Sequence, residues 1–437
     1  MKKSHKQHVI MSHLFLLARL SMHTLEQLLS GDLRQQTRIH IKDNLQYLPA
    51  NFVQFCPQVE VLDVSDNQLN SLPDTLEQLP NLRIVFASNN RFEVLPKVLG
   101  RCAKLEMVGF KSNLIREVPA AALPKNLRWL ILTDNQIEVL PEQLGEAALL
   151  QKCALAGNKL RALPQSMSQC TKLELLRISA NQLLHFPTQL LELPRLAWLA
   201  FAGNPFCQAF DHGSSLPKYQ LTDFEMDKVL GQGASGVISL AYPNASTNLP
   251  ASVAIKVFKG EVTSDGYPSD ELDACLHVDQ HPALVNFIGQ IQHANCSAVV
   301  MALIPEHFTN LGQPPSLATC TRDTFLPEQQ FSVEAISGIV KQMESLVAHL
   351  ADHHMCHGDL YAHNVLVDSA HNIVLGDFGA ASHYEYLPQE VQAKLMRVEQ
   401  RALAFFIEDM LSICQADEQG SDTYQNLKHQ SSELLGA

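Results

Sequence analysis

HGDLYAHN at residues 357–364, followed by DFG at residues 377–379, is the stretch that decides the fold of the second half of this chain. Transfer of a phosphoryl group needs a carboxylate to orient the accepting hydroxyl and two oxygen ligands to hold magnesium against a triphosphate. Asp359 fits the first role, and Asn364 and Asp377 fit the second. The spacing predicts a loop that turns back beneath a nucleotide, and a short hairpin that delivers Asp377 from the opposite side.

A glycine-rich segment, GQGASG at residues 231–236, lies upstream in the expected order. It ends one polar-apolar stretch and opens another at residues 237–242, so the pattern predicts a strand, a turn and a second strand. A dinucleotide-binding fold would instead need a helix after the turn. Gly231, Gly233 and Gly236 are expected to let backbone amides approach phosphate oxygens, because a side chain there would hold them away.

The segment VAIK at residues 253–256 then supplies Lys256, which is expected to contact the α- and β-phosphates. A lysine in that position needs an anionic partner on the next helix. Glu271 is our first candidate because it precedes an apolar-periodic stretch that ends at His281-Pro282. Asp270 and Asp273 remain as alternatives.

Residues from about 224 to 411 resemble a protein kinase catalytic domain, with every catalytic motif in order. The resemblance implies ATP and Mg2+ as cofactors and transfer of the γ-phosphate to a protein hydroxyl. It implies that Asp359, Lys256, Asn364 and Glu271 are the catalytic set, with Asn364 and Asp377 as magnesium ligands. By the same resemblance the adenine pocket has a roof of Ile238 and Ala254, a gatekeeper Met301, backbone contacts at Ala302 and Ile304, and a floor at Leu366.

The chain departs from the kinase pattern at several positions. Gly358 stands where many regulated kinases have arginine, Tyr361 where serine/threonine kinases have lysine, and His363 where tyrosine kinases have arginine. A positive contact on the transferred phosphoryl group is therefore missing unless His363 is protonated or another residue reaches in, so we expect a slow enzyme. We also expect that the short activation segment, residues 380–397, does not need to be phosphorylated, because position 358 has no arginine to bind the phosphate.

The same comparison predicts a minimal C-lobe. Glu399 takes the place of the aspartate that usually anchors the catalytic loop, and few residues follow position 411. Either the lobe is small, or something else covers the face that the remaining helices of an ordinary C-lobe would occupy. His357 is expected to be structural and to pack against Phe378.

The amino-terminal half is built from a repeat of 22 or 23 residues. It is marked by asparagines 67, 90, 113, 135, 158, 181 and 204, and by a proline six residues after each of the first six. Such a period predicts a solenoid whose asparagines form an internal ladder, as in leucine-rich repeats.

One column of this solenoid, six residues before each asparagine, is expected to lie on the concave face. It contains Val61, Ile84, Met107, Trp129, Lys152, Leu175 and Trp198, with Phe86 and Ile131 beside it. A continuous apolar patch marks an interaction surface. We therefore expect Trp129, Trp198 and Phe86 to bind either a protein partner or part of the kinase domain. Replacing both tryptophans with serine is expected to abolish that binding without lowering the melting temperature.

The composition agrees with two compact domains: 437 residues, of which 46% are hydrophobic and 18% charged. A net charge of −13 argues against nucleic acid as a partner. No run near 18 apolar residues lies between the repeats and the glycine-rich segment, which predicts no membrane span there. The ten cysteines show no metal or disulfide spacing, so we expect reduced thiols and a cytoplasmic location.

Together the two halves resemble the bacterial leucine-rich-repeat-containing protein kinases. The expected fold is an α/β leucine-rich-repeat solenoid followed by an α+β two-lobed kinase-like domain. The expected boundaries are an extension at 1–22, the solenoid at 23–207, a linker at 208–223 and the catalytic domain at 224–437.

The expected function is an ATP-dependent protein kinase, serine/threonine-directed by default. The alternatives are a nucleotide-binding pseudokinase scaffold and a small-molecule kinase.

Overall fold

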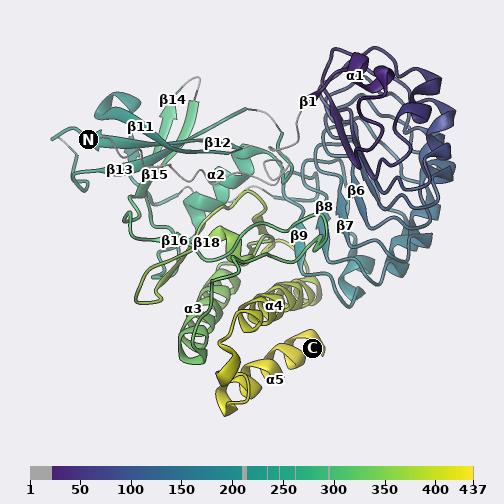
Figure 1. Cartoon of the computed structure of the whole chain (residues 1–437). Helices are drawn as coiled ribbons and strands as arrows, with labels where there is room; N and C mark the ends of the chain where they lie inside the picture. The colour runs from purple at the N-terminus through teal and green to yellow at the C-terminus, as the bar shows by residue number, and fades with distance from the viewer. Residues whose placement is uncertain are drawn as a thin grey trace, which may run out of the picture.

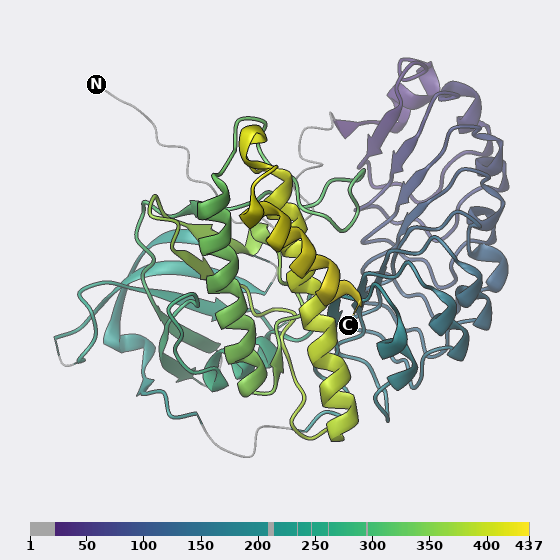
Figure 2. The ribbon, with the colours of Figure 1, turned by 90° about the horizontal axis from the view of Figure 1, so that it is seen from below.

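The computed structural model describes residues 22–208, 214–233, 235–245, 247–260, 262–293 and 296–436. The amino-terminal extension expected over residues 1–22 lies outside these ranges except for Met22. The described chain forms a curved repeat domain and a two-lobed domain that lie side by side in both views (Figures 1 and 2).

The repeat domain is a solenoid whose concave side is one parallel sheet of nine strands in chain order. The strands are β1 (Met22–His23), β2 (Arg38–Ile41), β3 (Val61–Asp63), β4 (Ile84–Phe86), β5 (Met107–Gly109), β6 (Trp129–Ile131), β7 (Lys152–Ala154), β8 (Leu175–Arg177) and β9 (Trp198–Ala200). Helix α1 (Leu25–Ser30) follows β1, and 3₁₀ helices line the convex side (Figure 1). These are η2 (Ala50–Phe55), η3 (Asp74–Gln78), η4 (Lys97–Arg101), η5 (Ala120–Ala122), η6 (Glu142–Glu146), η7 (Gln165–Gln169) and η8 (Thr188–Glu192).

The asparagine ladder satisfies the backbone where each strand ends. Asn67 donates its amide to the carbonyls of Ile41 (2.7 Å) and Val64 (2.9 Å) and accepts the Leu45 N–H (2.9 Å). The same pattern recurs at the later ladder asparagines, and a proline forms the N-cap of each 3₁₀ helix. Buried amides would be costly without these bonds, so the repeat period fixes the solenoid. The predicted solenoid and its ladder are confirmed.

The smaller lobe of the second domain is a six-stranded sheet in the order β10-β14-β15-β13-β12-β11. Its strands are β10 (Lys218–Tyr219), β11 (Phe224–Gln232), β12 (Gly236–Pro243), β13 (Val253–Phe258), β14 (Phe287–His293) and β15 (Cys296–Ala302), with η9 (Leu221–Asp223) ahead of β11 and helix α2 (Pro268–His277) after β13. Strand β10 lies inside the segment expected to be a linker, and it pairs parallel with β14. The sheet therefore takes in residues on both sides of the expected boundary at 224.

The larger lobe is built around three helices, α3 (Val333–Asp352), α4 (Gln389–Ser412) and α5 (Asp422–Gly436). Short elements complete it: β16 (Thr309–Asn310), β17 (Met355–Cys356), η10 (Ala362–Asn364), β18 (Val365–Val367), β19 (Ile373–Leu375), β20 (Ser382–His383) and η11 (Ala416–Glu418). Helix α3 buries one apolar face, as its periodicity predicts. Among the described residues, no helix is both long and apolar enough to cross a membrane.

The two domains share their hydrophobic cores. Leu175 and Trp198 of the solenoid belong to the core of the larger lobe, whereas Tyr384, Leu395 and Val398 of that lobe belong to the core of the solenoid. Figure 2 shows α4 running between α3 and the last repeats. The solenoid therefore covers the face of the small C-lobe that the sequence left unaccounted for.

Candidate active site

Lys256 on β13 and Glu271 on α2 form a salt bridge through Nζ and Oε1. The Glu271 side chain is only 2% exposed. Burial opposes the charge on Lys256, but the adjacent Glu271 carboxylate, together with Asp377, outweighs burial and holds the pKa of Lys256 above its usual value. Asp270 instead lies against the solenoid turn at Gly203, where burial raises its pKa to about 6. The choice of Glu271 as the partner of Lys256 is confirmed.

The glycine-rich segment forms the turn between the antiparallel strands β11 and β12, as its pattern predicts. The surroundings of the three glycines differ, so the absence of a side chain serves a different purpose at Gly236 than at the other two. A Cβ on Gly236 would lie 2.5 Å from the carbonyl oxygen of Val257, so close strand packing requires glycine there. A Cβ on Gly231 or Gly233 would meet nothing within 4 Å, which leaves room for a ligand beside the turn.

Four of the residues expected around adenine belong to one hydrophobic cluster that spans both lobes. Ala254 on β13 and Met301 on β15 are buried in it, and Ile238 and Ile304 pack against it. Ala302 donates its N–H to the carbonyl of Asn286 (2.9 Å), so any role of Ala302 in binding adenine falls to its carbonyl oxygen. Leu366 lies in the hairpin formed by β18 and β19.

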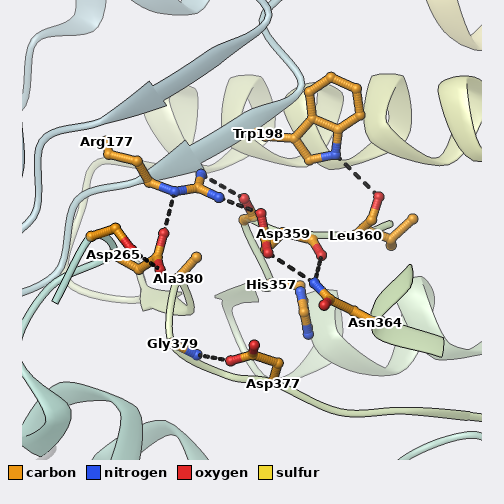
Figure 3. A network of polar contacts seen from close by, with 12 residues as sticks. Arg177, Trp198, Asp265, His357, Asp359, Leu360, Asn364, Asp377, Gly379 and Ala380 are labelled. Atoms are coloured by element: carbon orange, nitrogen blue, oxygen red, sulfur yellow. Dashed lines mark hydrogen bonds and ion pairs between the residues drawn. The ribbon is translucent and has the colours of Figure 1, made fainter. Parts of the chain in front are cut away.

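The catalytic loop places Asn364 against Asp359. The Asn364 amide donates to the backbone carbonyl of Asp359 (2.9 Å) and to its Oδ2 (2.8 Å). Asp377 has a left-handed backbone, φ 57°, and its Oδ1 accepts the Gly379 N–H (3.3 Å) (Figure 3). The Asn364 amide oxygen and the Asp377 carboxylate are the hard oxygen donors that Mg2+ prefers, so these residues fit the ion.

Two buried groups hold this loop from behind. His357 donates from Nε2 to the carbonyl of Gly376 (3.1 Å), and its ring lies 5.2 Å from that of Phe378, edge to face. Glu399 on α4 accepts the backbone N–H groups of His357 and Gly358, each at 3.1 Å. Burial raises the pKa of Glu399 to about 7. The expected structural role of His357 and the anchoring role of Glu399 are both confirmed.

Two side chains of the solenoid contact the catalytic loop, and of these Arg177 was not expected there (Figure 3). Arg177 on β8 forms an ion pair with Oδ1 of Asp359 and donates to the Gly358 carbonyl (2.8 Å) and to Oδ1 of Asp265 (2.8 Å). Trp198 on β9 donates from Nε1 to the Leu360 carbonyl (3.1 Å). The loop is thus held by the last two strands of the repeat domain as well as by its own domain.

This docking explains two of the departures from the kinase pattern. Gly358 has φ 71°, and a Cβ there would lie 2.7 Å from the carbonyl oxygens of Leu199 and Ala380. Glycine is therefore required by the backbone and by the approach of the solenoid. Tyr361 stacks on Trp198, with ring centroids 4.4 Å apart and planes 11° apart.

His363 is paired with a carboxylate of its own domain. Its Nδ1 lies 2.6 Å from Oδ1 of the buried Asp323. Burial opposes protonation, but the Asp323 carboxylate, together with Asp359 and Asp377, outweighs burial and raises the pKa of His363. The imidazole is thus paired with Asp323, whereas Arg177 donates directly to the Asp359 carboxylate.

A signal for Arg177 was present in the sequence. It lies four residues before a ladder asparagine, in a register column whose neighbours on β7 and β9 are Ala154 and Ala200. An arginine between two alanines of this column, on the face that also carries both tryptophans and Lys152, points to this residue when the catalytic loop has no lysine or arginine of its own.

The activation segment packs against the last repeat. The Ser382 hydroxyl accepts the N–H groups of Phe201 (3.0 Å) and Ala202 (3.2 Å), and both Ser382 and Tyr384 are 1% exposed. Their hydroxyl groups are therefore shielded from solvent as long as the domains stay docked.

The expected concave column is present in register, and residues of the kinase-like domain cover it. Trp198 packs between Tyr361 and Phe405, and Trp129 lies in a cluster with Phe86, Cys320 and Leu317. Of the two occupants that the sequence left open, a partner or part of the chain itself, the structure has the second. Both side chains are buried, which contradicts the reason for expecting that the loss of both tryptophans leaves the melting temperature unchanged.

Comparisons with known proteins agree with this architecture. Residues 224–406 match the family model described as protein tyrosine and serine/threonine kinase, and residues 58–79 match the model described as leucine rich repeat. Fibroblast growth factor receptor 1 of Xenopus laevis is 22% identical over 183 residues, or 39% of this chain and 22% of the receptor. The chain thus spans about a fifth of that receptor's length.

Among solved structures, a leucine-rich-repeat protein of Leptospira interrogans matches 40% of this chain and 51% of its own, with 24% identity and a TM-score of 0.34. The family models and the geometry together lead to one conclusion: the chain is a leucine-rich-repeat solenoid followed by a two-lobed protein-kinase-like domain.

Proposed function

We propose that this protein is an ATP- and magnesium-dependent protein kinase, serine/threonine-directed by default, that acts in the cytoplasm. Its solenoid, proposed over residues 23–207, is built into the kinase domain, proposed over residues 224–437. The short repeats with a proline six residues after each ladder asparagine support placing it with the bacterial leucine-rich-repeat-containing protein kinases.

The observation that carries this proposal is the contact between Asn364 and Asp359, with Asp377 following the β18–β19 hairpin and the Lys256–Glu271 pair formed. In many inactive arrangements of such a site the lysine–glutamate pair is broken, and phosphoryl transfer requires it. Here the helix α2 is already in the position that closes the pair.

Each residue then has a role in the transfer. Lys256 would hold the α- and β-phosphates, while Gly231, Gly233 and Gly236 form the turn over them. Asn364 and Asp377 would hold magnesium, which neutralises the charge of the triphosphate. Asp359 would orient the acceptor hydroxyl, whose oxygen bonds to the γ-phosphorus as the bond to ADP breaks, and would take its proton.

Asp359 retains the capacity for this role despite its contacts. A carboxylate has about four lone-pair positions, and each Asp359 oxygen has one side-chain donor, Arg177 on Oδ1 and Asn364 on Oδ2. The side chain is 21% exposed, so an acceptor hydroxyl can approach it.

The test is phosphoryl transfer by the full chain. Purified protein is incubated with γ-labelled ATP and Mg2+, and the labelled product is hydrolysed and its phosphoamino acid identified. Asp359→Asn should lower the rate by about 10²–10⁴-fold, the range for a general base, with nucleotide affinity retained. Equal incorporation by wild type and Asp359→Asn would refute the proposal, and label recovered only on a small molecule would favour a small-molecule kinase.

A second candidate, a nucleotide-binding scaffold, is favoured by the burial of the activation segment. Ser382 and Tyr384 lie against the solenoid, so the segment that usually receives a peptide is engaged within the chain. The same assay separates the two functions. A scaffold would bind nucleotide and transfer no phosphate, whereas a kinase would do both.

A further inference from the structure

Arg177 is buried in the solenoid, yet all its contacts in Figure 3 are with the kinase domain. Its side chain is 4% exposed, and its three nitrogens each have a different partner: Nε bonds Asp265, Nη1 bonds the Gly358 carbonyl and Nη2 bonds Asp359. A planar guanidinium held at three points has little freedom, so it fixes the groups around it.

The charge around the site makes this cation important. Asp377 and Glu271 lie close enough to interact electrostatically, and Asp359 and Asp265 both adjoin Arg177. Lys256 is already paired with Glu271. Burial opposes the charge on Arg177, but Asp359 and Asp265 outweigh burial and hold its pKa above the usual value. Arg177 therefore stays cationic and offsets the carboxylate that must orient the acceptor.

We propose that Arg177 is a positioning residue of the kinase site, contributed by the leucine-rich-repeat domain. It sets the orientation of the Asp359 carboxylate and of the loop backbone at Gly358, in a loop that carries Tyr361 where a lysine was expected. The repeat domain is then part of the active site, and phosphoryl transfer depends on its docking. This inference rests on the proposed kinase activity.

The geometry distinguishes positioning from simple packing. Trp198 and Tyr361 pack the same interface without touching the Asp359 carboxylate, whereas Arg177 bonds it directly. Loss of Arg177 leaves Asp359 free to rotate about its side-chain bonds, although Asn364 still bonds Oδ2. Loss of Arg177 should therefore lower the maximal rate of transfer. Nucleotide binding should be retained, because Lys256 and the glycine-rich turn, which would face the nucleotide, are unchanged.

The test compares the full chain with Arg177→Met, Arg177→Lys and a matched control, Arg161→Met. Arg161 is also a solenoid arginine in an ion pair, with Glu138, but its side chain is 69% exposed, and no bond joins it to the catalytic loop within the part of the chain that the structure describes. Initial rates of autophosphorylation are measured over a range of ATP concentrations, together with the melting temperature of each protein.

Arg177→Met should lower the maximal rate by about 10²-fold, the cost of a misplaced catalytic group. The apparent KM for ATP should stay within about threefold, because ground-state binding is retained. Arg177→Lys, which keeps the charge but not the three-point contact, should recover part of the rate, and Arg161→Met should match wild type. When Asp359→Asn is already present, adding Arg177→Met should lower the maximal rate only a little further, because both changes disable the same carboxylate.

Three results would overturn the inference. One is an Arg177→Met rate equal to wild type. Another is a faster rate, which would mean that the ion pair restrains the enzyme. The third applies if Arg177→Met fails to fold: a maximal rate of Arg177→Lys equal to that of wild type would then reject the positioning role. A wild type no more active than Asp359→Asn would instead reject the kinase function and this inference with it, so the two failures are distinguishable.

Discussion

Replacing Trp198 with alanine should destabilise the whole protein by about 4 kcal/mol, in the range for removing a fully buried tryptophan. The indole is 1% exposed and lies between two rings, Tyr361 at 4.4 Å and Phe405 at 5.2 Å. Its Nε1 also donates to the Leu360 carbonyl, which would lose that partner. The change therefore combines a cavity with an unsatisfied carbonyl in a core that both domains share.

A second variant separates these two contributions. Trp198→Phe keeps an aromatic ring against Tyr361 and Phe405 but loses the hydrogen bond to Leu360, so it should cost about 1–3 kcal/mol. Leu184 provides the control, because its side chain is 61% exposed on the same solenoid, and Leu184→Ala should stay within about 0.5 kcal/mol of wild type.

The assay is denaturant unfolding followed by circular dichroism, with the midpoint and slope fitted for each variant. A destabilisation of Trp198→Ala no larger than that of Leu184→Ala would refute the reasoning, because it would mean that the indole is not buried against the kinase domain in solution. Unfolding of wild type in two separate transitions would also contradict a shared core.

The remaining predictions concern the catalytic loop and its anchors. Gly358→Ala should weaken docking and cost about 1–3 kcal/mol, because the residue has φ 71° and its Cβ would meet the Leu199 carbonyl; a midpoint of unfolding equal to wild type would count against this approach. Burial raises the pKa of Glu399 from 4.5 to about 7, so the folded state binds this proton more tightly than the unfolded chain. Its contribution to stability is fully present below pH 4.5 and is lost as the pH rises through 7, by up to about 1.4 kcal/mol per pH unit, and Glu399→Gln should flatten that slope in unfolding measured from pH 5 to 8. Phosphatase treatment should leave the initial rate of autophosphorylation nearly unchanged, because the Ser382 and Tyr384 hydroxyls are buried against the last repeat; a large loss that preincubation with ATP restores would show that phosphorylation there is required.

The parts of this structure that depend on local pattern could be predicted from the sequence. The ladder of Asn67 and its successors repeats a fixed set of backbone bonds, so its period alone gives the solenoid. The pairing of Lys256 with Glu271 followed from the order of strand, glycine turn and helix. In both cases the partners are set by elements that are neighbours along the chain.

The parts that depend on docking could not be predicted in the same way. Arg177 and Asp359 are 182 residues apart, and their contact exists only because the last repeats lie against the catalytic loop. The concave column was identified correctly as an interaction surface, but a sequence pattern does not state which apolar surface meets it. Gly358 was interpreted as a missing cation, although its left-handed backbone and the nearby Leu199 carbonyl are the physical reason for glycine.

The central claim, that the last repeats are built into the kinase domain, can be tested by the fluorescence of one residue. The chain has two tryptophans, so Trp129→Phe leaves Trp198 as its sole indole. Because Trp198 is 1% exposed and points from β9 into the catalytic lobe, its emission should be that of a buried indole, and acrylamide should quench it poorly until the protein unfolds. Emission and quenching in the folded protein equal to those of the unfolded chain would show an open concave face and would contradict the account.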